Sequence, residues 1–102
     1  MQSKVETTRS ADRRSSERWL TDKPLRWRLR GESRSSEGVV VERSLNGIVL
    51  LADALGAPEL GEHLKPDSSE MAVRHGFRCA VVVRRGAEEA LGRRKVYLEI
   101  LA

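Results

Sequence analysis

The first regular pattern along this chain is an alternation of hydrophobic and polar residues with a period of two. In residues 24–30, Leu25, Trp27 and Leu29 alternate with three arginines. This is the pattern of a strand with one buried face, so the three apolar side chains are expected in the core. Pro24 suits the first position of such a strand, where no backbone donor is needed.

Five more short strands are expected along the rest of the chain. Their markers are β-branched or aromatic runs bounded by turn residues. They lie at residues 38–42, 48–51, 61–65, 77–84 and 95–101. The dipeptide Asn46-Gly47 is the strongest hairpin signal and joins the second strand to the third. Residues 52–60 fit either one helical turn or a loop, residues 66–69 a turn, and residues 85–92 a loop.

Six strands with short connections, and no helix above two turns, predict an all-β fold, specifically a six-stranded antiparallel β-barrel. A closed barrel removes the exposed edges that such apolar strands would otherwise present. Residues 1–17 show no period and contain one bulky hydrophobic residue, Val5. Such a segment buries too little apolar surface to fold alone. We therefore expect a flexible arginine-rich arm over residues 1–18 and a barrel domain over residues 19–102.

The positive charge of the chain is concentrated in its first third. The net charge of the 102 residues is +4, and residues 1–31 carry nine Lys or Arg against four Asp or Glu, a net +5. Fifteen of the nineteen basic residues are Arg, whose planar guanidinium suits phosphate groups and guanine edges. The arm is therefore expected either to capture an anionic ligand or to stay a solvated tail.

Several classes of function find no support in the sequence. Cys79 is the single cysteine, so neither an internal disulfide nor a Cys-based metal site is expected. His63 and His75 lack metal-ligand spacing, and no nucleophile–base pair is recognisable. We therefore expect no enzyme, no metal and no cofactor. No apolar run has membrane-spanning length and no signal peptide is recognisable, so a cytoplasmic location without membrane insertion is expected.

Two short motifs follow one another along the chain. Residues 14–18 (RSSER) fit RxxxR just ahead of the first predicted strand, and residues 42–47 (ERSLNG) fit ExSxxG where the second strand turns into the third. In this order they resemble the PilZ family, whose signature is RxxxR followed by [D/N]xSxxG. The resemblance covers about residues 12–101. The chain departs from the family at Glu42, where the family has Asp or Asn.

The resemblance to the PilZ family implies a split barrel that binds the second messenger cyclic di-GMP. The arm would order over the ligand and signal to a partner protein, an effector in motility, biofilm formation or polysaccharide secretion. The expected ligand-binding residues are Arg13, Arg14, Arg18, Glu42, Ser44 and Gly47. Arg13 would add a cation beneath a second ligand molecule, and both one and two ligands per domain are compatible with the sequence.

These residue types suit the chemistry of cyclic di-GMP, which has two negative phosphates and two guanines. Arg14 and Arg18 match the phosphates and the acceptors O6 and N7 of guanine. Glu42 and Ser44 are two residues apart on a strand and so share a face. There, Glu42 can accept from the N1–H and N2–H groups of guanine, and Ser44 can contact a phosphate or the ring. Gly47 is expected to adopt a positive φ and to let the ligand approach closely.

Several alternatives stay open on the sequence alone. Glu42 is equally compatible with an ion pair to Arg43 or Arg78, and residues 44–47 with a turn that has no ligand role. Trp19 fits either a base-stacking or a core position. A PilZ-like adaptor that binds proteins without nucleotide is the main alternative function. A nucleic-acid-binding barrel is less favoured, because four aromatic residues make a poor stacking platform.

Overall fold

The computed structural model describes residues 17–101, which form six β-strands, one α-helix and one 3-10 turn. In chain order the elements are β1 (Trp19–Leu29), β2 (Ser36–Arg43), β3 (Gly47–Asp53), β4 (His63–Pro66), α2 (Ser69–His75), β5 (Ala80–Glu89), η1 (Ala90–Gly92) and β6 (Arg93–Ile100). The prediction of a mainly antiparallel β fold is confirmed. No helix in this part of the chain has the length and apolar character needed to cross a membrane.

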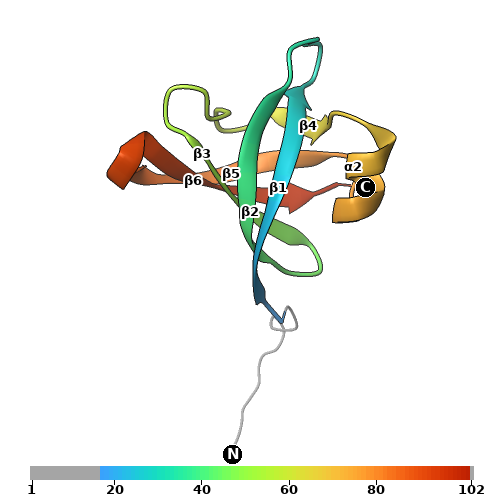
Figure 1. The fold of residues 1–102 in the computed structure, drawn as a ribbon, viewed down its shortest axis with the longest axis horizontal. Helices are drawn as coiled ribbons and strands as arrows, with labels where there is room; N and C mark the ends of the chain where they lie inside the picture. Colours follow the sequence, from blue (N-terminus) through green and yellow to red (C-terminus); the bar gives the residue numbers. More distant parts are fainter. Residues whose placement is uncertain (1–16, 102) are drawn as a thin grey trace, which may run out of the picture.

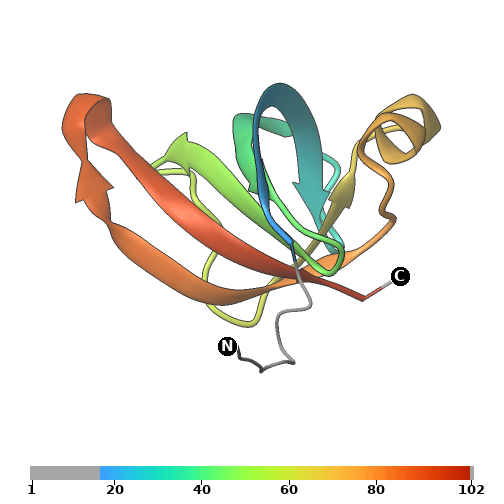
Figure 2. The same ribbon diagram turned by 90° about the horizontal axis from the view of Figure 1, so that it is seen from below.

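The six strands pair in a closed cycle. Their order is β1-β2-β3-β6-β5-β4, and every neighbouring pair is antiparallel. The cycle closes because β4 pairs with β1, with Trp27 opposite Pro66. The tip of the long β5–β6 hairpin and the helix α2 lie at opposite ends of the molecule in both views (Figures 1 and 2). Closure leaves the strands without a free edge along the paired segments.

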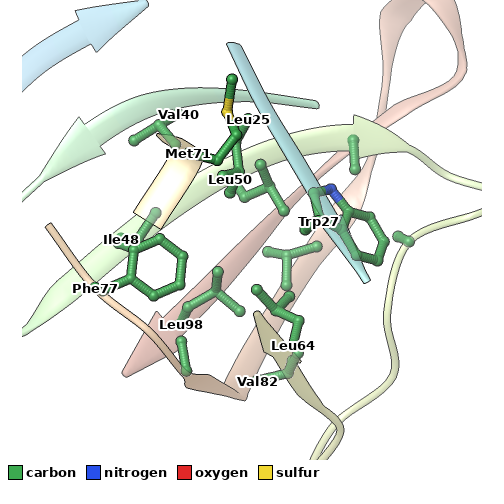
Figure 3. Close-up of a cluster of buried hydrophobic side chains, with 14 residues drawn as sticks. Leu25, Trp27, Val40, Ile48, Leu50, Leu64, Met71, Phe77, Val82 and Leu98 are labelled. Carbon is green, nitrogen blue, oxygen red and sulfur yellow. The ribbon is translucent and has the colours of Figure 1, made fainter. Parts of the chain in front are cut away.

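The core fills the interior of this closed sheet with apolar side chains from all six strands (Figure 3). Leu25 and Trp27 of β1 are 0% and 2% exposed, as predicted, whereas Leu29 is only partly buried and packs against this cluster. Met71 of α2 and Phe77 belong to the same cluster. Each large side chain buried in this way stabilises the fold by roughly 1.5–3 kcal/mol.

The helix α2 is absent from the sequence-based prediction. It has only seven residues, so its periodicity is too short to be recognised, but both of its ends carry clear capping signals. The Ser68 side chain accepts a hydrogen bond from the Met71 N–H at 3.2 Å, and Gly76 ends the helix in the left-handed conformation with a φ of 71°. Ser at the N-cap and Gly after the last turn are the residues that such ends favour.

The predicted loop over residues 85–92 is wrong in most of its length. β5 continues to Glu89, and Glu88 and Glu89 pair with Arg94 and Arg93 of β6. The side chain of Arg94 also donates to the Gly86 carbonyl at 2.6 Å. Glu88 and Glu89 have low β propensity, so their pairing with β6, which is a tertiary effect, determines their strand conformation.

Candidate functional site

A cavity of about 350 Å³ lies beside the turn that joins β2 to β3. Its lining includes four of the six predicted ligand-binding residues, Arg18, Glu42, Ser44 and Gly47. The other two, Arg13 and Arg14, lie outside the residues that the structure describes. The fold therefore brings the last arginine of the RxxxR motif against the ExSxxG motif, although the two motifs are well separated in sequence. We call this cavity the turn pocket.

Arg18 and Glu42 form an ion pair in the turn pocket, with 3.2 Å between Nη1 and Oε2. They meet because the start of β1 pairs with the end of β2. The partner of Glu42 is thus Arg18, rather than either partner considered from the sequence. The two side chains are 66% and 28% exposed, and a pair so open to water contributes at most about 1 kcal/mol. A ligand can therefore displace or bridge this pair at little cost.

Glu42 reaches the turn pocket because β2 contains a bulge. Val40 pairs with Leu50 and Glu42 with Val49, which leaves Val41 as an extra residue. Val40 is 2% exposed, and strict alternation would point Glu42 toward the core as well. The extra residue turns Glu42 outward instead. In the sequence, such a bulge is indicated by a carboxylate at a position where strict alternation predicts a buried side chain.

A second bulge places Arg84, which the sequence analysis did not assign to the site. Val82 pairs with Leu98 and Arg84 with Tyr97, so Val83 is the extra residue. Arg84 therefore points away from the core and lines the turn pocket. Its guanidinium carbon lies 4.0 Å from the centre of the Tyr97 ring, a cation–π contact. The sequence signal for this bulge is the same as for the one before Glu42, namely a charged residue at a position where strict alternation predicts a buried side chain.

Gly47 contributes space to the turn pocket. The Ser44 N–H donates to the Gly47 carbonyl at 2.9 Å and closes the turn. A Cβ at position 47 would lie 3.2 Å from the Ser44 Oγ and 3.4 Å from the Leu98 carbonyl oxygen. Gly47 is not among the glycines with a positive φ, so the predicted left-handed conformation is wrong. The glycine is needed for close packing beside Ser44.

The turn pocket is electropositive. Among the described lining residues, three are arginines, Arg18, Arg43 and Arg84, and one is acidic, Glu42. Burial lowers the pKa of the Arg43 guanidinium from its ordinary value. Its Nη1 atom is buried and has no hydrogen-bond partner within residues 17–101. Arg43 was also missing from the predicted site, although it stands inside the ExSxxG motif.

These groups define what the turn pocket can bind. It offers planar cationic donors, one carboxylate acceptor, a hydroxyl group and an aromatic ring. Such a set matches an anionic ligand that has both donor and acceptor edges. Over residues 17–101, no group of three or more His, Cys, Asp or Glu is placed to hold a metal ion.

In comparisons with known proteins, no family model matches the chain, and no curated protein is significantly similar to it. Neither comparison therefore identifies the chain as a member of the PilZ family, and the resemblance is carried by the two motifs alone.

Proposed function

We propose that the turn pocket binds cyclic di-GMP and that the closed sheet is a PilZ-like split barrel. The observation that supports this most directly is the meeting of the two motifs. Arg18, from the first motif, and Glu42, Ser44 and Gly47, from the second, line one electropositive cavity. The pairing of β1 with β2 brings these residues together, and the support for the proposal is that residues of both motifs line the same cavity.

Each group in the turn pocket has a partner on the dinucleotide. Arg18 can donate to O6 and N7 of a guanine, which is the commonest specific contact between an arginine and a base. Glu42 can accept from the N1–H and N2–H groups of a guanine. Arg84 can pair with a phosphate, and its contact with the Tyr97 ring helps to hold it in position. Ligand binding would then replace the exposed pair between Arg18 and Glu42 with two charge-assisted contacts.

The arm supplies the remaining contacts in this proposal. Arg13 and Arg14 are expected to close over the ligand and to order residues 1–18. Fixing a backbone residue costs roughly 1–2 kcal/mol, while each charge-assisted hydrogen bond contributes roughly 1.5–3 kcal/mol. Binding therefore requires several of these bonds and depends on each arginine. The ordered arm would present a new surface to an effector protein.

Calorimetry with cyclic di-GMP and the full chain tests this proposal. Arg84→Ala and Arg18→Ala should each lower the affinity by about tenfold or more, since each removes a charge-assisted contact. Arg78→Ala is the matched control, because Arg78 is exposed and lies outside the turn pocket. Absence of binding by the unaltered protein, or an equal loss in Arg78→Ala, would contradict the proposal.

Features at the end of the β2–β3 hairpin that is remote from the turn pocket favour a second function, that of a nucleotide-independent adaptor. A groove of about 770 Å³ lies there, beside Leu55 and Leu91, which are 104% and 90% exposed. The Ala54 N–H donates to the Gly92 carbonyl at 2.8 Å and holds the two segments together. Leu91 has a φ of 68°, and such backbone strain in a residue other than glycine is typical of functional sites.

The charges of this groove indicate its partner. Among the lining residues that the structure describes, Glu37, Asp53 and Glu88 are acidic and only Arg34 is basic, so a segment with both basic and apolar residues would complement the groove. Titration with a synthetic peptide that alternates Arg and Leu tests this function. Leu55→Ser should weaken binding, whereas Val73→Ser, at an exposed site outside the groove, should not. Equal binding by both variants would exclude the groove as the docking site.

A further inference from the structure

A second cluster of cations lies on the other side of Arg43 from the turn pocket. A cavity of about 220 Å³ is formed there by the start of β1, the end of β2 and the end of α2. Its charged or titratable lining residues are Lys23, Arg43, Arg74 and His75. No Asp or Glu is among the lining residues that the structure describes. We call this cavity the helix pocket.

Arg43 has a buried donor without a partner. Among the described residues, none accepts a hydrogen bond from its buried Nη1 atom, and burial lowers the pKa of its guanidinium. Leaving a charged donor without a partner in a buried position costs more than leaving a neutral one. A bound anion would remove this cost. The position is fixed by the fold, because Arg43 pairs with Trp19 in one ladder and with Ile48 in the other.

The helix α2 brings the other two groups into place. The Nε2 atom of His75 lies 2.8 Å from the carbonyl oxygen of Pro24, so this nitrogen donates and carries the hydrogen. When the ring is protonated, Nδ1 becomes a second donor. Arg74 is held by Glu70 through an ion pair of 3.0 Å, in which the two side chains are 47% and 72% exposed. Such an open pair leaves Arg74 available to an incoming anion.

The lining of the helix pocket is apolar on one side. Trp19 is 52% exposed and Val73 is 82% exposed, and both line the cavity. Large apolar groups on the surface beside a cluster of cations are typical of a binding site for a ligand that has an apolar part and an anionic part. A ring can lie against the tryptophan while an oxyanion meets the cations.

We propose that the helix pocket binds the phosphate group of an organic phosphate, with Lys23, Arg43 and Arg74 as donors and Trp19 against the organic part. This site is separate from the turn pocket and, of the described lining residues, shares only Arg43 with it. The proposal does not depend on cyclic di-GMP binding, because its charges, its unpartnered donor and its apolar wall are all properties of the helix pocket itself.

Tryptophan fluorescence of the full chain tests the proposal. Trp27 is buried in the core, so a change in emission on ligand binding reports mainly on Trp19, and Trp19→Phe should abolish it. Phenyl phosphate and inorganic phosphate serve as probes at constant ionic strength. We expect a saturable change with both and tighter binding of phenyl phosphate, since only this probe has a ring to place against Trp19. A response that never saturates, or equal affinity for the two probes, would contradict the proposal.

Variants locate the response in one pocket. Lys23→Ala and Arg74→Ala should each weaken phenyl phosphate binding, and the double variant should lose at least about tenfold in affinity. Arg84→Ala changes only the turn pocket and Arg78→Ala neither pocket, so both should bind as the unaltered protein does. An equal loss in Arg84→Ala would assign the phosphate to the turn pocket and overturn the proposal. As a second readout, phenyl phosphate should raise the pKa of His75 in an NMR titration, because an anion favours the imidazolium form.

Discussion

Gly47 determines the shape of the turn pocket at the scale of single atoms. In Gly47→Ala, the new Cβ would lie 3.2 Å from the Ser44 Oγ, and this hydroxyl can rotate away. We therefore expect the free energy of unfolding to fall by less than about 1 kcal/mol, while the affinity for cyclic di-GMP falls because Ser44 is displaced. Urea denaturation and calorimetry measure the two effects. Unchanged affinity would show that Ser44 has no contact with the ligand.

The sequence was informative at some residues and misleading at others. The alternation of apolar and basic residues correctly placed Leu25 and Trp27 in the core, because this pattern is typical of a strand with one buried face. The motifs identified Glu42 as a residue of the candidate site, but alternation with Val40 would have turned it inward. The pairing of β2 with β3 shows that Val41 is an extra residue, and this bulge turns the Glu42 side chain outward. Arg84 was missed for the same reason.

The helix α2 is the element that positions the helix pocket, and its end depends on a glycine. Gly76 has a φ of 71°, a conformation that costs other residues roughly 1–2 kcal/mol. We expect Gly76→Ala to lower the free energy of unfolding by about this amount and to weaken phenyl phosphate binding, because Arg74 and His75 lie just before it. Gly56→Ala is the matched control, since a Cβ at Gly56 meets nothing within 4 Å. Equal destabilisation in both variants would contradict this account.

Elements differed in how well the sequence predicted them. The strands with β-branched runs were found, whereas α2 was not, because a helix of two turns shows little periodicity. Its capping residues, Ser68 and Gly76, were the available signal. The outer half of β5 was also missed, because Glu88 and Glu89 favour no strand on their own and are ordered by β6.

At the scale of the whole molecule, His75 makes stability depend on pH. Burial lowers the pKa of His75 from its ordinary value of 6.5, the hydrogen bond to Pro24 opposes this, and the nearby charges of Lys23, Arg43 and Arg74 lower it further. The unfolded chain therefore takes up this proton more readily than the folded protein. The contribution of His75 to stability is complete above about pH 6.5 and is lost as the pH falls below it.

A variant isolates this contribution from that of the other titrating groups. In His75→Gln the amide can still donate to the Pro24 carbonyl, but it cannot take up a proton. We expect the free energy of unfolding of this variant to fall less than that of the unaltered protein between about pH 7.5 and about pH 5.5. Urea denaturation at the two pH values measures the difference. A parallel fall in both proteins would contradict the role of His75.

The overall architecture was predictable only in class. Six strands in antiparallel order follow from the periodicity and the turn signals. That β4 returns to β1 does not, because the pairing of Trp27 with Pro66 joins segments far apart in the chain. The start of β1 lies beside the end of β2 through the antiparallel pairing of these two consecutive strands, and this pairing creates the pocket in which the two motifs meet.

The central claim is that the turn pocket and the arm close together around cyclic di-GMP. Amide proton–nitrogen NMR spectra of the full chain, recorded with and without the dinucleotide, test it directly. The account predicts shifts at residues 9–18, at residues 42–47 and at Arg84 and Tyr97, with the core amides unchanged. If the amides of residues 9–18 and of the turn pocket keep their positions at saturating dinucleotide while the fold is intact, the claim is wrong.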